Sequence, residues 1–249
     1  MIQIYNGTLT SKERVLRTFN HEKADRVPIG YFANPGIQKR VAAALGVLAD
    51  KDSVNDALGV DFKGLMPAYT GKPLFTAPGP ERHVHPLTGA VTRWVANEDG
   101  GYWDYCDFPL AEADDEIIAN WPVPDPDDFD YDGLLEKCKA YGHKAVYFGH
   151  PGISDVMNNT GMIRGMENIY MDLALETESV MTLLDRRMKA ELAMFERALD
   201  KAGTMLILSG QAKTWARSAR LSSVWICSVP RSARATSRSS TWPPATASR

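Results

Sequence analysis

Short apolar runs alternate with longer segments of helical spacing along most of this 249-residue chain. Four of these runs are apolar on both faces, as in strands that lie between two layers of helices. They predict buried strands at residues 27–32, 59–66, 144–149 and 204–210. Because helical segments separate the runs, the pattern favours an α/β fold with a parallel sheet covered by helices.

Several of the predicted helices carry their own start and stop signals. Thr10 begins the first, and Glu13 stands three residues further on to complete a capping box. Asn34 caps the second, Pro35 occupies its first turn, and Gly46 ends it. Apolar spacing predicts further helices near residues 53–58, 131–141, 166–176 and 179–203.

Residues 67–103 have a different texture, in which short β runs such as "RHVHP" and "AVTRWVA" are separated by Gly and Pro. This pattern predicts a hairpin excursion from the sheet. His83 and His85 alternate along the first run and therefore share one face. A metal site needs a third ligand, and none is evident in the sequence, so we predict no metal site there.

The composition is that of a globular protein, with 44% hydrophobic and 24% charged residues. No run of about 18 apolar residues is present, and the first residues lack the features of a signal peptide. Cys106, Cys138 and Cys227 are unclustered and odd in number, which fits reduced thiols. We therefore expect a cytoplasmic protein without a membrane partner. No glycine-rich motif for a nucleotide follows a predicted strand.

Several stretches, taken in order, resemble the uroporphyrinogen decarboxylase superfamily, which contains the haem-pathway decarboxylase and corrinoid- or coenzyme M-linked methyltransferases. They are "TSKERVLRTFNHEKADRVPIG", "ALGVDF", "WPVPDPDDFDYDGL", "GMENIYMDLALETESVMTLLDRRM" and "ALDKAGTMLILSG". Their order and spacing over residues 10–210 are closer to the methyltransferase-like branch. The resemblance implies the amino-terminal half of a (β/α)8 TIM barrel, with its active site at the carboxyl ends of the strands.

The resemblance implies a small-molecule enzyme, with methyl transfer as the expected reaction and tetrapyrrole decarboxylation in porphyrin biosynthesis as the alternative. The decarboxylase binds its substrate's carboxylates through arginines after the first strand, where this chain has "GYFANPG" without arginine. Members of the methyltransferase branch can use a corrinoid and bind zinc through a His-x-Cys pair and a later Cys. This sequence has no such cluster, so no cofactor is identifiable in the chain itself.

Five residues are candidates for the site. Asp61 and His150 are the catalytic candidates, since the family places an aspartate in its pocket and a histidine after a strand can transfer protons near neutral pH. Tyr31, Asn34 and Asn158 lie at or after strand ends and are the candidates for substrate binding. Structural alternatives stay open: a turn aspartate at Asp61, a helix cap at Asn34, and a backbone-bonded loop histidine at His150.

Residues 211–249 contain seven of the 28 Lys and Arg residues, three of the six Trp and none of the 31 Asp and Glu, which leaves a net charge of −10 on residues 1–210. Because tryptophan has one codon, it constrains the DNA. In the frame that starts at each third base, Trp215 followed by Ala216 encodes Gly, and "QAKTWARS" can encode Gly-Glu-Asp-Leu-Gly-Thr-Gln. The amino-acid sequence encoded in that frame resembles the segment that follows the fourth strand in the superfamily, which favours a frameshift near residue 210.

Two alternatives stay open for this basic tail. Its cations and tryptophans can bind single-stranded nucleic acid by charge and stacking, although the cations are not clustered, and a solvated tail without a partner is the plainer alternative. We expect residues 1–210 to form a partial barrel and residues 211–249 to be disordered. A barrel stopped after four strands exposes two sheet edges, so we predict self-association and no turnover by this chain.

Overall fold

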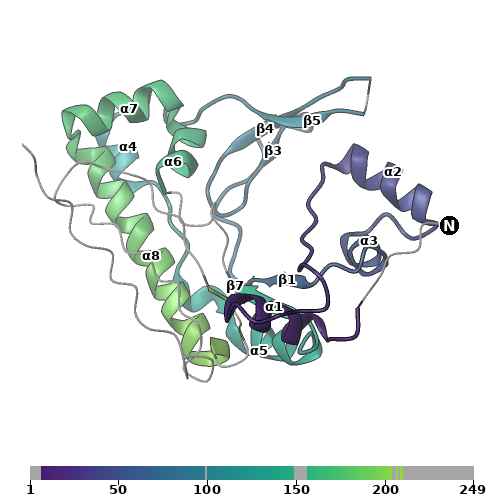
Figure 1. Cartoon of the computed structure of the whole chain (residues 1–249). Helices are drawn as coiled ribbons and strands as arrows, with labels where there is room; N and C mark the ends of the chain where they lie inside the picture. The colour runs from purple at the N-terminus through teal and green to yellow at the C-terminus, as the bar shows by residue number, and fades with distance from the viewer. Residues whose placement is uncertain (1–6, 99, 149–155, 204–205, 207, 210–249) are drawn as a thin grey trace, which may run out of the picture.

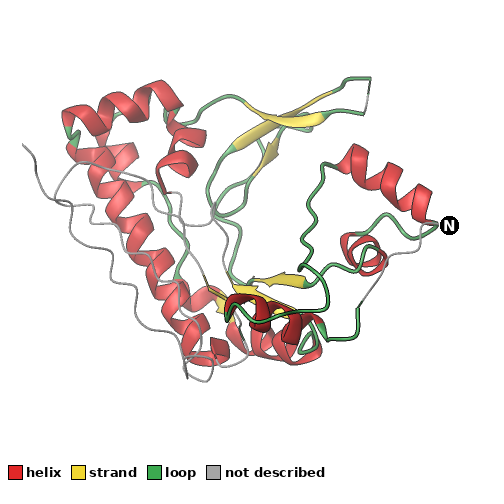
Figure 2. Ribbon diagram, viewed as in Figure 1, coloured by secondary structure: helices red, strands yellow, loops and turns green. Residues whose placement is uncertain are grey.

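The structure of this chain is a computed structural model, which describes residues 7–98, 100–148, 156–203, 206 and 208–209. Within these residues the fold is mixed α/β, with three small sheets and helices around them (Figures 1 and 2). The described strands form open sheets and do not close into a barrel. His150 and the basic tail, residues 211–249, lie outside the described residues.

A parallel sheet lies at the base of the molecule as drawn in Figure 1. Its strands, in spatial order, are β1 (Phe62–Leu65), β7 (Ala145–Phe148) and β8 (Leu208–Ser209). Phe62 pairs with Ala145 at the start of β1, and Tyr147 pairs with Leu208. Three of the four predicted strands are thus confirmed as strands and are parallel, as their pattern indicated. Strand β7 is largely buried, whereas in β1 only Leu65 is buried.

The prediction of a strand at residues 27–32 is wrong, because this segment forms no ladder with β1. Pro28 has no backbone N–H, and the N–H of Ile29 donates to Oδ2 of Asp61 at 2.8 Å. Only one backbone bond joins the two segments here, from the N–H of Asp61 to the carbonyl of Ile29. The carboxylate of Asp61 therefore accepts the hydrogen bond that the N–H of Ile29 would otherwise donate to a neighbouring strand.

The first helices follow the local signals in the sequence. Helix α1 (Ser11–Phe19) has the full capping box, in which Thr10 and Glu13 bond each other's backbone N–H groups. Helix α2 (Pro35–Leu45) ends at Gly46, which has a φ of 71°. Only glycine adopts that left-handed conformation at little cost. A shorter helix, α3 (Lys51–Ala57), precedes β1. Both α2 and α3 lie on the far side of β1 from α8 in Figure 1.

The predicted hairpin excursion is confirmed as a three-stranded antiparallel sheet. Its strands are β3 (His83–Val84), β4 (Val91–Val95) and β5 (Tyr102–Tyr105), in that order. This sheet projects away from the parallel sheet (Figure 2). A second antiparallel pair, β2 (Ala68–Tyr69) with β6 (Phe129–Asp130), joins the segments that follow β1 and precede α5.

The remaining described helices pack against one long helix, α8 (Glu178–Ala202). They are α4 (Asp115–Asn120), a 3-10 turn (Pro126–Asp128), α5 (Tyr131–Ala140), α6 (Val156–Arg164) and α7 (Met166–Leu175). The predicted helices near residues 131–141, 166–176 and 179–203 are confirmed. Helices α4 and α6 were not predicted. The six residues of α4 are too few to show helical spacing in the sequence, although Asp114 caps it.

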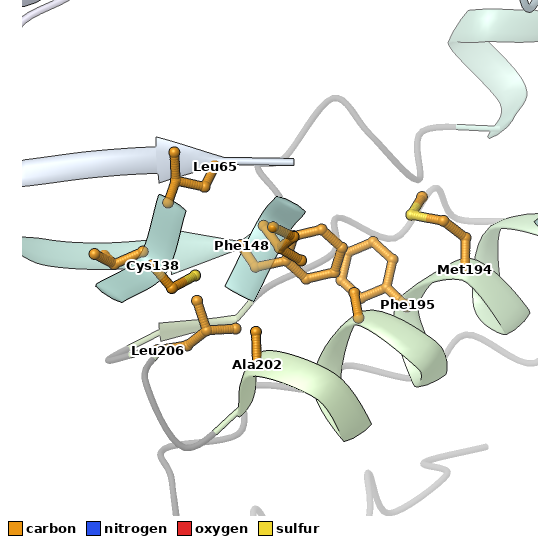
Figure 3. Close-up of a cluster of buried hydrophobic side chains, with 10 residues drawn as sticks. Leu65, Cys138, Phe148, Met194, Phe195, Ala202 and Leu206 are labelled. Carbon is orange, nitrogen blue, oxygen red and sulfur yellow. The ribbon is translucent and has the colours of Figure 1, made fainter. Parts of the chain in front are cut away.

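Helix α8 takes part in two separate hydrophobic clusters, one toward each of its ends. Its carboxyl-terminal part packs Phe195 against Phe148 of β7, with ring centroids 4.4 Å apart (Figure 3). Its amino-terminal part contributes Val180, Leu183 and Leu184 to a second cluster with α4, α6 and α7. The two clusters fix α8 at both ends, and Arg187, Ala190 and Glu191 between them line the cavity described next.

Candidate functional site

A cavity of about 1170 Å³ lies beyond the carboxyl end of β1. Met66, which directly follows β1, lines it, and α6, which follows β7 along the chain, supplies Asn158. The β3–β5 sheet and helix α8 supply the other walls. In parallel α/β folds, this edge of the sheet is where ligands bind.

Most of the cavity wall is apolar, with many aromatic and methionine side chains. These residues are Met66, Leu87, Ala90, Trp103, Tyr105, Phe108, Val123, Phe129, Met162, Met166 and Met194. A smaller set of polar side chains shares the wall: His83, His85, Asp104, Asn158, Asn159, Arg187 and Glu191. An apolar wall with few polar groups is the common character of small-molecule sites.

Arg187 is the most buried charged group in this wall, with 7% of its surface exposed. Its Nη1 donates to Oγ1 of Thr160 at 3.0 Å. The hydroxyl of Thr160 donates in turn to the carbonyl of Val156 at 2.6 Å, which fixes its lone pair toward the guanidinium. Burial lowers the pKa of Arg187, and the charge of Glu191 opposes that change. An arginine remains charged even so, because its ordinary pKa is very high.

His83 and His85 both line the cavity, so they share a face as the sequence predicted. The N–H of Leu87 donates to Nδ1 of His85 at 3.3 Å, which leaves the proton of the neutral ring on Nε2. The His85 ring is open to the cavity yet closely surrounded by protein atoms. This burial lowers its pKa, and the charges of His83 and Arg187 lower it further. His85 is therefore neutral at pH 7.

Asp61, a predicted catalytic residue, lies at the amino end of β1 and is fully buried. Its Oδ1 accepts from Nη1 of Arg14 at 2.6 Å, and its Oδ2 accepts from Nη1 of Arg26 at 2.6 Å. Although burial opposes ionisation, bonds from Arg26, Ile29 and other donors lower the pKa of Asp61 overall. The structure thus places this carboxylate in an ion-pair cluster and not among the described residues that line the cavity.

The other predicted site residues have different locations. Asn34 is exposed and caps α2, where its Oδ1 accepts from the N–H of Ile37 at 2.8 Å. Tyr31 is half-buried, and its hydroxyl has no hydrogen-bond partner among the described residues. Asn158 lies on α6 and is the one predicted site residue that the structure places in the cavity wall among those described. His150 lies outside the described residues.

Sequence reasoning missed Arg187 and Glu191, although a signal was present. One face of α8 is lined by buried apolar residues: Val180, Leu183, Leu184, Met194, Phe195, Ala198 and Ala202. This apolar series is interrupted between Leu184 and Met194, where Arg187 and Glu191 occupy the same face. Two charges on an otherwise apolar face indicate a site at that face.

The described residues offer no group of three or more His, Cys, Asp or Glu side chains that could hold a metal ion. His83 and His85 are therefore a pair without a third ligand in the described part of the chain. No described helix is both long enough and apolar enough to cross a lipid bilayer. Comparisons of the chain with protein-family models, curated proteins and solved structures found no match.

Proposed function

We propose that residues 10–210 form the amino-terminal half of a (β/α)8 barrel of the uroporphyrinogen decarboxylase superfamily, and that the parent enzyme is a cytoplasmic methyltransferase. The sheet of β1, β7 and β8 supports this, because its three strands are parallel and lie side by side in their order along the chain, as the strands of such barrels do. The observation that carries the proposal is the cavity at the carboxyl end of β1, lined also by α6 and α8.

The stretch that resembles the family's entrance also has a defined role in this fold. Arg14, Asp25 and Arg26 belong to "TSKERVLRTFNHEKADRVPIG", and all three are joined to Asp61 directly or through Arg14. The cluster ties α1 and the segment before α2 to the start of β1. The entrance stretch and the stretch that contains Asp61 are far apart in the sequence, yet their charged residues pair with one another. This pairing is a structural reason for both stretches to occur in one chain, and it supports the resemblance.

In the proposed reaction, the bond from the methyl carbon to its donor breaks and a bond to a nucleophilic acceptor forms. The apolar walls exclude water from this transfer, and Arg187 holds an anionic group of the substrate. A corrinoid, when bound, supplies the methyl group in the corrinoid-linked branch. The described donor set does not fit the family's zinc ion, since His83 and His85 lack a third ligand and a cysteine beside them. We route no step through zinc.

Tetrapyrrole decarboxylation is the alternative reaction, and the cavity supports it less well. Uroporphyrinogen carries several carboxylates, each of which needs a cationic partner in a dry site. Arg187 is the single arginine among the described residues that line the cavity. One buried guanidinium can pair with one anionic group, whereas uroporphyrinogen has several carboxylates to pair.

We further propose that this chain as written is a non-enzymatic product of a frameshift near residue 210. Sequencing the coding DNA from about codon 195 through several hundred bases past the stop tests this. A one-base change that restores an open frame with four more βα units supports the proposal. An intact frame, confirmed on both strands, refutes it.

The activity test compares the frame-restored protein with the 249-residue chain. Each is incubated with methylcobalamin and a thiol acceptor, and loss of the methylcobalamin absorbance is followed alongside formation of the methyl thioether. A parallel incubation with uroporphyrinogen measures decarboxylated products. We expect thioether from the restored protein alone. Porphyrinogen products without thioether would replace methyl transfer with decarboxylation, and the absence of both would refute the proposed function.

The edges of the parallel sheet give a second test of the truncated state. Within the described strands, β1 and β8 each have a neighbour on one side only. Open edges pair with other chains. We expect sedimentation velocity to show concentration-dependent dimers or larger species for the 249-residue chain. A single monomeric boundary at all concentrations would contradict this expectation.

A further inference from the structure

We propose that the cavity binds an organic monoanion, with its carboxylate or similar planar oxyanion group on Arg187 and a flat apolar body against the wall that contains Trp103. The inference rests on the proposed function only in taking this cavity as the substrate site. It adds that the ligand carries a single negative charge and a flat apolar body, which the family resemblance does not supply.

Arg187 is a buried cation with few described hydrogen bonds. A guanidinium has five N–H donors, and burying such a charge is costly unless its hydrogen bonds are made. Within the described residues, Arg187 makes one hydrogen bond, to the neutral hydroxyl of Thr160. Glu191, one helical turn further along α8, attracts it by charge without a described hydrogen bond between the two. The remaining donors are suited to a ligand with two oxygens in one plane.

The histidines add hydrogen-bond donors to the cavity wall. Burial and the charges of His83 and Arg187 lower the pKa of His85, which favours its neutral ring. In that tautomer Nε2 carries a proton and can donate. His83 also lines the cavity, with its ring centroid 5.5 Å from that of Trp103. An anion on Arg187 would therefore find a further donor in the same wall, the Nε2 of His85.

The acidic groups in the wall limit the ligand to a single negative charge. Glu191 and Asp104 both line the cavity. Asp104 lies 3.8 Å from Arg93, an exposed pair that is largely screened by water. A dianion such as a phosphate monoester would meet repulsion from the carboxylate of Glu191, which shares the wall with Arg187. A monoanion gains its partner at Arg187 with less opposition.

The apolar part of the wall defines the rest of the ligand. Trp103 is 52% exposed although it lies beside Trp94, with ring centroids 5.4 Å apart. Met162, Met166 and Met194 face the same space, and methionine adapts its shape to a ring surface. A cavity of about 1170 Å³ is far larger than a carboxylate alone. A flat hydrocarbon body can bury its faces against these side chains.

The experiment uses two probes of the same shape, 2-naphthoate and its neutral analogue 2-naphthamide, titrated into the full 249-residue chain by calorimetry at pH 7. We expect 2-naphthoate to bind at least about tenfold more tightly than 2-naphthamide. The Arg187→Met chain should lose that difference while it keeps its affinity for 2-naphthamide. Lys189→Met removes an exposed cation from the same helix and should change neither affinity.

A second variant keeps the test decisive if Arg187→Met does not fold, as judged by near-UV circular dichroism. Arg187→Lys retains the charge without the planar fork and should bind 2-naphthoate with intermediate affinity. Equal affinities of the two probes for the unsubstituted chain would overturn the inference, as would 2-naphthoate binding that Arg187 variants leave unchanged.

The outcomes separate this inference from the proposed function. Charge-selective binding through Arg187, together with a frame-restored protein that forms no thioether, would refute the methyl transfer alone. Methyl transfer by the restored protein, together with equal binding of the two probes, would refute the monoanion inference alone.

Discussion

Arg14 and Asp61 form a buried ion pair in which Nη1 donates to Oδ1 at 2.6 Å, with side-chain exposures of 1% and 0%. Asp61 accepts a second guanidinium bond from Arg26, and Arg14 donates to Asp25 as well. Two cations and two carboxylates thus form one ion-pair cluster at the amino end of β1. Such a cluster is stable as a set, and removing one member leaves the others buried without their partners.

We expect the Asp61→Asn chain to lose about 3–5 kcal/mol of unfolding free energy, because Arg26 then lacks its carboxylate partner and Arg14 keeps only Asp25. Urea unfolding followed by circular dichroism at pH 7 measures this loss. Asp185→Asn, at a position with 54% side-chain exposure, is the control and should change stability by less than about 0.5 kcal/mol. An Asp61→Asn chain of unchanged stability would refute the structural role. If its frame-restored form also lost turnover, Asp61 would be catalytic.

Asp25 should make the protein sensitive to acid. Bonds from Arg14 and from the N–H groups of Leu9 and Thr8 hold the pKa of Asp25 well below its usual range. Because the folded pKa is lowered, the stabilisation is complete above the unfolded value of roughly 3.9 and is lost as the pH falls toward the folded value. Urea unfolding between pH 6 and pH 2.5 should show this decline, and Asp25→Asn should make it shallower. Identical slopes in the two chains would contradict the assignment.

The contact between Phe148 and Phe195 fixes α8 against β7, and through α8 it positions Arg187. We expect Phe148→Ala to lower the unfolding free energy by about 3–5 kcal/mol, because a ring is removed from a fully buried position. Phe32→Ala, at a position 90% exposed, is the matched control and should cost less than about 0.5 kcal/mol. Denaturant unfolding compares them, and equal losses in the two variants would contradict the proposed core.

The two described cysteines should resist thiol reagents in the folded chain. Cys138 is fully buried and Cys106 is 8% exposed, and burial raises the pKa of both thiols. In a Cys227→Ser chain at pH 8, we expect labelling by a colorimetric disulfide reagent to be at least about 100-fold slower than after denaturation. Complete labelling of both thiols within seconds under native conditions would contradict their burial.

Local sequence signals predicted the features that depend on neighbours in the chain. The capping box of Thr10 and Glu13, the cap at Asn34 and the end of α2 at Gly46 occur as expected. Each depends on bonds or backbone angles within a few residues, so the sequence alone contains the needed information. The apolar runs likewise predicted β1, β7 and β8, because strands covered on both faces are apolar throughout.

Contacts between distant residues decided the rest. Residues 27–32 have the composition of a strand, but the carboxylate of Asp61, more than 30 positions away, takes the N–H of Ile29. Asp61, a candidate catalytic residue, also lies in an ion-pair cluster, at the opposite end of β1 from Met66 in the cavity wall. Local preference is worth less than burying a charge with its partners, so tertiary structure overrode it.

The cavity shows the same division. The sequence by itself determined that α8 is a helix with an apolar stripe, and that His83 and His85 share a face. Only the tertiary structure brought Arg187 beside the β3–β5 sheet, since two hydrophobic clusters hold α8 at either end and leave its charged middle over the cavity. Side-chain spacing fixes which residues share a face, whereas long-range packing decides what that face meets.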